Sequence, residues 1–405
     1  MKKFNKVLSV AVASAMVMAM AGCGNTDNGS AATGTNAATE SAAVSDSAAS
    51  GSVFKIGGIG PTTGGAAVYG LAVQHGAEIA VEEINAAGGI NGYQVEFKFQ
   101  DDEADAEKSV NAYNALKDWG AQIIDGSTTS GACIAVTDKT KEDNMFQITP
   151  SGSAVECVQY DNNFRVCFSD PNQGLASAQY IGENGLAEKI AVIYDSSDVY
   201  SSGIYEKFAK EAENQPFEIV AAEAFTADNK TDFSVQLQKA KDAGADMVFL
   251  PIYYQESALI LTQAAAMGYA PKWFSCDGMD GILGGVDNFD VSLTEGVMLL
   301  TPFAADATDD LTQSFVTKYK EKYGETPNQF AADSYDAIYV IKAAIEKSGV
   351  TPDMSVSDIC DGMKAAMTEI TVDGLTGNGM TWTADGEANK APKAVVIENG
   401  AYKAM

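Results

Sequence analysis

Hydrophobic and polar positions along residues 53–405 follow two alternating patterns. Short runs rich in β-branched and aromatic residues predict strands, and stretches with apolar residues at every third or fourth position predict helices. The first series of predicted strands is VFKI, YQVEFKF, AQIIDG and MFQITP, separated by helices near 70–87, 105–119 and 131–143. The second series is KIAVIYD, FEIVAAEAF, DMVFLPIYY, KWFSCDG and EGVMLLTPF, with helices near 172–184, 201–213, 231–243, 255–268 and 281–288. Strands that alternate with helices in this way predict parallel sheets covered by helices.

The presence of two such series predicts two lobes. Residues 53–405 exceed the length that one hydrophobic core usually organises. The fold class expected is therefore α/β, with two doubly wound parallel-sheet lobes. Further helices near 309–323, 329–347 and 355–367 and a short strand-rich tail fit neither series as a simple continuation. A chain that crosses between the lobes more than once would explain these segments.

The N-terminal segment has the pattern of a bacterial lipoprotein signal. MKKFNK carries three lysines, and VLSVAVASAMVMAMA is an apolar run too short to span a membrane. Residues 20–23, Met-Ala-Gly-Cys, resemble a lipobox, so residues 1–22 are expected to be removed and Cys23 to be acylated. The alternative is an ordinary secretory signal with an incidental cysteine. Residues 23–52 then form the lipidated cysteine and a flexible tether, which predicts a body held at the extracytoplasmic face of a cell membrane.

Composition and charge exclude several classes of partner. The formal net charge is −29, and such an acidic surface repels nucleic acid and anionic lipid headgroups, although solubility alone would also account for it. No cysteine spacing matches a zinc pattern, so we expect no metal. Cys157 and Cys167 could form a disulfide outside the cell or remain two buried thiols. The single histidine, His75, lies in a helical pattern and is expected on a helix surface. The acidic run DDEADAE at 101–107 lacks calcium-loop spacing and is expected to cap the helix that follows.

A glycine-rich turn, GGIGPTTGGAAVYG at 57–70, lies between the first strand and the first helix. It lacks the G-x-G-x-x-G spacing of dinucleotide folds, and Pro61 removes an amide where a phosphate would need one. We therefore expect no nucleotide cofactor and interpret the turn as the edge of a binding cleft. The predicted export of the protein would also separate it from a nicotinamide cofactor, which disfavours a nicotinamide dehydrogenase.

Several motifs in order carry a family resemblance. FKIGGIGPTTGGAAVYG, INAAGGINGYQVEFKFQDDEAD, ITPSGS, FRV and AVIYDSSDVYSSG resemble the amino-acid-binding lipoproteins of ABC importers, of the branched-chain (leucine/isoleucine/valine) type. This resemblance implies a type I periplasmic-binding-protein fold, in which two lobes joined by three crossover strands close on a small ligand. The crossovers would fall near 170, 302 and 375. The lobes would then comprise 53–170 plus 303–375, and 171–302 plus 376–405.

The resemblance also implies roles for hydroxyl residues of the first lobe. Ser130 matches a position whose hydroxyl and amide hold the ligand α-carboxylate, and a helix N-terminus is a suitable place for an anion. Ser151 matches a position whose carbonyl accepts the ligand ammonium. Ser153 matches one whose hydroxyl and amide bind both ends of the ligand. The alternatives are a simple helix cap at Ser130 and an ordinary turn at 150–153.

The second lobe would supply the acidic partner. Tyr200 matches a carboxylate-binding tyrosine, and Asp277 matches the acid that pairs with the α-ammonium; the alternative for Asp277 is a surface turn, with Glu256 the next candidate for the ammonium. Side walls would be formed by three aromatic residues, each of which could instead belong to the core: Tyr69, Tyr253 and Phe330.

The function implied is capture of an L-amino acid, branched-chain or similarly small and apolar, and delivery to an ABC permease. Such a protein performs no catalysis, needs no cofactor and is expected to be a monomer. An extracytoplasmic sensor of the same fold, which signals ligand occupancy to a partner protein, remains the alternative.

Overall fold

The computed structural model describes residues 51–405. The predicted signal peptide, Cys23 and most of the predicted tether lie outside the described residues. Within residues 51–405, no helix has both the length and the apolar character needed to cross a bilayer.

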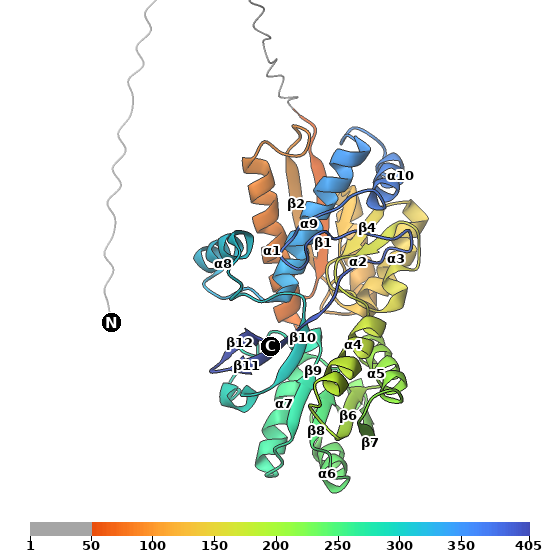
Figure 1. The fold of residues 1–405 in the computed structure, drawn as a ribbon. Coiled ribbons are helices and arrows are strands. Elements are labelled where there is room, and N and C mark those ends of the chain that lie inside the picture. The colour runs from red at the N-terminus through yellow and green to blue at the C-terminus, as the bar shows by residue number, and fades with distance from the viewer. Residues whose placement is uncertain (1–50) are drawn as a thin grey trace, which may run out of the picture. The chain divides into compact units, whose positions relative to one another are not determined.

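The first lobe is built on a five-stranded parallel sheet with the order β2-β1-β3-β4-β5. The strands are β1 (Phe54–Gly60), β2 (Val95–Asp101), β3 (Ile123–Asp125), β4 (Phe146–Thr149) and β5 (Asn163–Arg165). One face is covered by α1 (Ala67–Ala86), α9 (Gln329–Ser348) and α10 (Val356–Met367), the other by α2 (Ala106–Trp119) and α3 (Ser130–Asp143) (Figure 1). Buried strand residues alternate between the two faces, as Ile56 and Ile59 do in β1.

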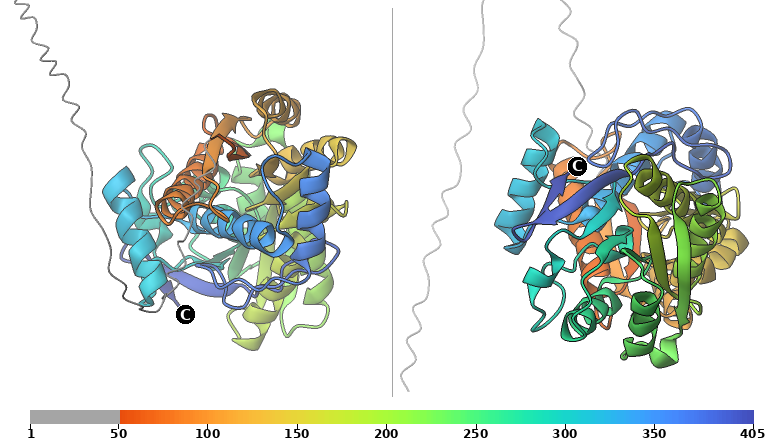
Figure 2. Two further views of the ribbon diagram at one scale, coloured as in Figure 1. Left: turned by 90° about the horizontal axis from the view of Figure 1, so that it is seen from above. Right: turned by 60° about the horizontal axis from the view of Figure 1, so that its bottom comes forward.

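The second lobe is built on a seven-stranded sheet with the order β12-β11-β10-β9-β8-β6-β7. The strands are β6 (Lys189–Asp195), β7 (Glu218–Phe225), β8 (Met247–Leu250), β9 (Lys272–Ser275), β10 (Met298–Thr301), β11 (Lys393–Glu398) and β12 (Ala401–Ala404). Helices α4 (Asp170–Glu183) and α5 (Val199–Ala212) cover one face, and α6 (Ser234–Asp242) and α7 (Tyr254–Ala266) cover the other. The antiparallel hairpin β11–β12 extends the edge beyond β10 (Figure 2).

The chain passes between the two lobes three times: between β5 and α4, between β10 and α8 (Asp310–Tyr323), and between α10 and β11. Helix α8 returns to the first lobe, where it packs against α1. The predicted α/β fold with two parallel-sheet lobes is thus confirmed. The residue boundaries given above for the lobes and crossovers stay a prediction.

One predicted helix was wrong, and several predicted strands were too long, such as DMVFLPIYY, of which only Met247–Leu250 form a strand. Residues 281–288 form successive turns instead of a helix, because Gly281 and Asn288 have φ values of +105° and +58° and two further glycines lie between them. The predicted strand KWFSCDG ends at Ser275, and a short 3₁₀ turn (Asp277–Met279) follows it. This early end places Asp277 in a loop at the carboxyl edge of the sheet.

The five described cysteines are free and buried, so the disulfide considered between Cys157 and Cys167 is absent from the structure. His75 lies on a helix, as expected, where its partly exposed ring stacks on Tyr323 at 3.6 Å between ring centres. The acidic run caps α2 as expected, since the side chain of Asp105 accepts a hydrogen bond from the Lys108 amide at 2.9 Å.

Candidate ligand-binding site

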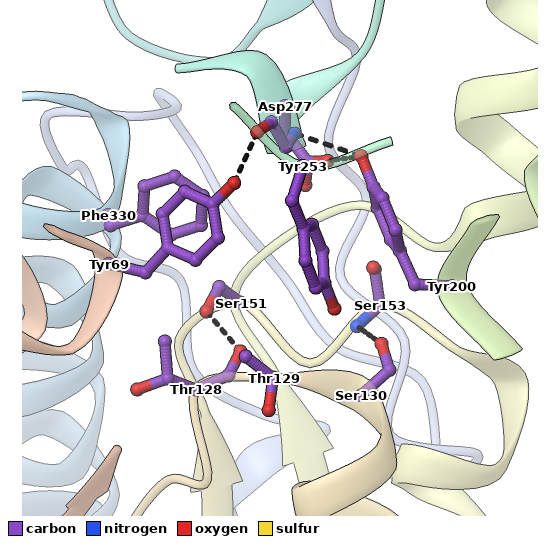
Figure 3. Close-up of a pocket in the computed structure, with 11 residues that line it drawn as sticks. Tyr69, Thr128, Thr129, Ser130, Ser151, Ser153, Tyr200, Tyr253, Asp277 and Phe330 are labelled. Atoms are coloured by element: carbon purple, nitrogen blue, oxygen red, sulfur yellow. Dashed lines mark hydrogen bonds between the residues drawn. The ribbon is translucent and has the colours of Figure 1, made fainter. Parts of the chain in front are cut away.

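A small pocket lies between the two lobes and encloses about 240 Å³ of space, part of it open to solvent. Residues from both lobes line it (Figure 3): Tyr69, Thr128, Thr129, Ser130, Ser151, Ser153, Tyr200, Tyr253, Asp277, Gly278 and Phe330. All eight candidates named from the sequence therefore lie around one cavity. Thr128, Thr129 and Gly278 were not predicted.

Sheet topology explains why these residues meet. In open α/β sheets, ligands bind beyond the carboxyl ends of the strands, where the strand order reverses. The orders β2-β1-β3 and β7-β6-β8 create such a point in each lobe. In the first lobe, the lining residues follow β1, β3 and β4, except for Phe330, which lies at the start of α9. In the second, they follow β6, β8 and β9.

Hydroxyl groups and backbone amides form the first-lobe wall of the pocket. Ser130 is the first residue of α3, and its Oγ accepts hydrogen bonds from the amides of Ser153 and Ala154, both at 3.1 Å. Because both acceptor positions of this oxygen are used, its proton is available to a ligand. Among the described residues, the hydroxyls of Thr129 and Ser153 are buried without a protein partner. This wall can donate several hydrogen bonds to an anion, next to the positive end of a helix dipole.

Asp277 gives the second-lobe wall its charge and is the one ionisable carboxylate or cation that lines the pocket among residues 51–405. Its Oδ1 accepts a hydrogen bond from the hydroxyl of Tyr200 at 2.7 Å, and that hydroxyl in turn accepts one from the Gly278 amide at 2.9 Å. Burial raises the pKa of Asp277 to about 7, against the opposing effect of hydrogen bonds from Tyr200 and Gln173. A ligand cation at this carboxylate would supply the missing counter-charge.

In this structure the Tyr200 hydroxyl therefore donates its hydrogen bond to Asp277. Its single hydroxyl proton is directed to Asp277 Oδ1, so it is not available to a ligand carboxylate in the same arrangement. The role predicted for Tyr200 as a carboxylate ligand stays a prediction, and the contact observed is one that orients the acid.

Aromatic side chains close the pocket at one side. The rings of Tyr69 and Phe330 lie 4.3 Å apart, and Tyr69 also contacts Tyr253 edge-on. The Tyr69 hydroxyl reaches from the first lobe to the second, where it donates to the Gly278 carbonyl and accepts from the Tyr254 amide at 3.1 Å. Tyr69 is thus both an apolar wall and a contact between the lobes.

The glycine-rich turn at 57–70 leads into this wall, because its residue Tyr69 lines the pocket. A Cβ atom at Gly60 would lie 2.1 Å from Thr128 Oγ1, so only glycine allows the end of β1 to pass Thr128. Asp101 at the end of β2 accepts hydrogen bonds from Thr62 N at 2.8 Å and Thr63 Oγ1 at 2.6 Å. These hydrogen bonds attach the turn to the end of β2, and the turn contributes Tyr69 to the edge of the pocket.

Glu256, the alternative partner for an ammonium, does not line the pocket, and its carboxylate pairs with Lys230 at 2.9 Å. No cluster of three or more potential metal-binding side chains occurs in the part of the chain that the structure describes.

Comparison with known proteins places this architecture in a family. The family model described as periplasmic binding protein matches residues 53–401. Leu/Ile/Val-binding protein homolog 3 of Brucella melitensis is 31% identical over 300 residues, covering 74% of this chain and 80% of that protein. The leucine-, isoleucine-, valine-, threonine- and alanine-binding protein of Pseudomonas aeruginosa is 30% identical over 303 residues, covering 73% and 79%.

Similarity to solved structures supports the same family assignment. The branched-chain amino acid transporter substrate-binding protein LivJ of Streptococcus pneumoniae, in complex with isoleucine, superposes with a TM-score of 0.79 at 29% identity, covering 87% of this chain and 98% of that chain. The leucine-binding protein LivK of Thermotoga maritima gives 0.76 at 28% identity, with the same coverage. The chain belongs to the periplasmic binding protein family, and its recognition from sequence as an ABC-transporter substrate-binding protein of the Leu/Ile/Val type is confirmed.

The residues missed by the sequence argument had a weak signal. Thr128 and Thr129 belong to the same strand-to-helix turn as Ser130, and Gly278 follows Asp277 directly. A rule that takes whole turns at the carboxyl ends of strands would have included all three.

Proposed function

We propose that this protein captures an L-α-amino acid between its lobes and delivers it to an ABC importer, without chemistry of its own. The observation that carries the proposal is the pairing of two unlike walls across one small pocket. The Asp277 carboxylate suits an ammonium, and the Ser130 hydroxyl at the start of α3 suits a carboxylate. An α-amino acid carries both groups on neighbouring atoms.

The aromatic side of the pocket supports a small or branched apolar side chain. Tyr69 and Phe330 offer hydrophobic surface, and a second charge on the ligand would find no additional charged partner among the described lining residues. The similarity to proteins named for binding leucine, isoleucine and valine supports the same choice. Ser151, Ser153, Tyr200 and Tyr253 would complete the ligand's surroundings.

A thermal-shift panel of L-amino acids, sugars, nucleosides and peptides tests this function. A ligand present at 100 times its dissociation constant adds about 2.7 kcal/mol of apparent stability. We expect the largest stabilisation from leucine, isoleucine or valine. Strong stabilisation by a sugar, nucleoside or peptide, with none by free amino acids, would contradict the proposal.

We further propose that the protein is a monomer anchored outside the cell membrane by acyl chains on Cys23. The anchor is proposed from the lipobox-like residues 20–23, and an extracytoplasmic location agrees with the family. Cys23→Ala should move the protein from the membrane fraction to the soluble fraction, while Ser30→Ala in the tether should leave it sedimenting. A Cys23→Ala variant that still sediments with membranes would show that another anchor exists.

A further inference from the structure

Arg165, the last residue of β5, lies directly behind the loop that carries Ser153. Its side chain is wholly buried. One guanidinium nitrogen, Nη1, donates to the carbonyls of Gly152 at 3.3 Å and of Ser153, and the other, Nη2, donates to those of Ala154 at 2.9 Å and Val155 at 3.4 Å. Four successive carbonyls of one loop therefore point at one planar cation. This geometry requires the fork of an arginine, because a lysine offers a single nitrogen.

The loop held in this way is part of the pocket. The amides of Ser153 and Ala154 share trans peptide planes with the carbonyls of Gly152 and Ser153, so they face away from Arg165, and they donate to Ser130 Oγ. The Ser153 hydroxyl lines the cavity. Arg165 touches no lining atom that a ligand would contact, but it fixes the peptide planes whose other side orients Ser130 and Ser153.

The other end of Arg165 is attached to the third connection between the lobes. Its backbone amide donates to the Gly386 carbonyl at 3.0 Å, and its carbonyl accepts from the indole of Trp382 at 2.8 Å. Its Nε lies 3.3 Å from Oε2 of Glu387, an ion pair without hydrogen-bond geometry. Glu387 is 33% exposed and comes from the segment between α10 and β11.

We propose that Arg165 is a positioning residue for ligand binding, and that Glu387 acts through it to couple the third connection between the lobes to the pocket loop Gly152–Val155. This inference rests on the proposed function, since it concerns affinity at the same pocket. Movement of the connection during closure would then change the orientation of the Ser153 and Ala154 amides. The physical reason is that the guanidinium is one rigid, planar group, so a displacement that changes its position alters all of the charge-assisted hydrogen bonds it makes to the loop.

Calorimetry tests the expected effect on ligand affinity, with the L-amino acid that binds best in the thermal-shift panel. Glu387→Gln keeps the size of the side chain and removes its charge, and because Glu387 is partly exposed we expect only about 3- to 10-fold weaker binding. Arg165→Lys keeps the charge and loses the fork, for which we expect roughly 10- to 100-fold weaker binding. The matched control is Glu223→Gln, which removes the charge of another partly buried ion pair, with Lys239 near the edge of the second sheet, and should stay within about twofold of the parent.

A double-mutant cycle separates positioning from general destabilisation. If Glu387 acts through Arg165, Glu387→Gln should have almost no effect in the Arg165→Lys background. Independent structural damage would instead give additive losses, and that result would overturn the coupling.

Hydrogen exchange of the ligand-free proteins gives a readout that needs no ligand. Amides of Ser153, Ala154 and Asp170, the last of which donates to the Ser153 carbonyl at 2.9 Å, should exchange faster in Glu387→Gln than in the parent or in Glu223→Gln. Unchanged exchange and unchanged affinity in Glu387→Gln would overturn the proposal even if Arg165→Lys fails to fold. If the parent binds no amino acid, the proposed function fails, while the exchange data still decide whether the pair holds the loop.

Discussion

The two lobes present side chains from equivalent positions of equivalently ordered sheets, but the chemistry at those positions differs. After the third strand of each series the pocket receives Ser130 from one lobe and Tyr253 from the other, and after the fourth it receives Ser153 and Asp277. One wall thus offers neutral dipoles and the other offers a formal charge. The difference teaches that one topology supports two kinds of ion recognition, backbone and hydroxyl donors for an anion and a buried carboxylate for a cation.

The largest expected effect comes from removing the charged wall. Asp277→Ala leaves a ligand ammonium buried without its counter-charge, which costs on the order of 2–5 kcal/mol, or roughly 30-fold to a few thousand-fold in affinity. A deamino analogue should bind the parent poorly and lose little more in the variant. Glu256→Ala, at the acid that pairs with Lys230, is the matched control. If calorimetry finds the affinity of Asp277→Ala within about threefold of the parent's, a residue other than Asp277 must pair with the ligand ammonium.

The hydroxyl wall should respond more weakly to a single deletion. Ser130→Ala removes the acceptor for two amides and the donor proposed for the ligand carboxylate, and hydrogen bonds to charged groups contribute about 1.5–3 kcal/mol. We therefore expect roughly 10- to 100-fold weaker binding by calorimetry. An amino alcohol, which lacks the carboxylate, should lose much less than the amino acid, and Ser348→Ala on α9 should change neither. Equal losses for both ligands would instead indicate a general disturbance of the pocket.

The two walls should also differ in their response to pH, because only one of them titrates. Asp277 has a pKa of about 7 without ligand, and pairing with an ammonium would lower it. Below pH 7 the carboxyl must lose a proton to bind, so affinity should fall by about tenfold per pH unit as the pH decreases, and binding should release a proton. Calorimetry in buffers of different ionisation enthalpy measures that proton. The slope should vanish in Asp277→Asn, and a parent protein without pH dependence between 5 and 7 would contradict the assignment.

The smallest effect is expected at the contact that joins the walls. Tyr69→Phe keeps the aromatic surface and removes the bonds to the Gly278 carbonyl and the Tyr254 amide. One net hydrogen bond contributes about 0.5–1.5 kcal/mol, so binding should weaken roughly 2- to 10-fold, mainly through faster dissociation. Stopped-flow measurements can compare it with Tyr339→Phe, whose hydroxyl bonds Glu83 away from the pocket. A dissociation rate equal to the parent's would show that this contact does not hold the lobes together.

Periodicity in the sequence was enough to predict the alternation of strands and helices, because both buried strands and amphipathic helices carry a strong local pattern. It failed at 281–288, where a helix-like spacing is overridden by Gly281 and by left-handed backbone at Asn288. The strand β5 is three residues long and carries too little pattern to be recognised alone. Local signals therefore predict elements well and their ends poorly.

The site residues were predicted by another route. Ser130, Ser153 and Asp277 came from motif resemblance. Ser130 and Ser153 follow the neighbouring strands β3 and β4, whereas Asp277 follows β9 in the sheet of the other lobe and meets them across the pocket. Arg165 was present in the quoted motif FRV, but its contacts with a loop ten residues away and with Glu387 depend on tertiary geometry that no spacing reveals.

The close crossing of α1 and α9 has a consequence for how this pocket could change its ligand over evolutionary time. A Cβ atom at Gly76 would lie 2.0 Å from the carbonyl oxygen of Ala331, so these helices meet backbone to backbone one residue away from Phe330 and two turns from Tyr69. A side chain at residue 76 would therefore force the two helices apart. Substitution of Gly76 is therefore expected to displace Tyr69 and Phe330 together, whereas replacing Tyr69 or Phe330 in place would alter the side-chain preference of the pocket without moving a helix.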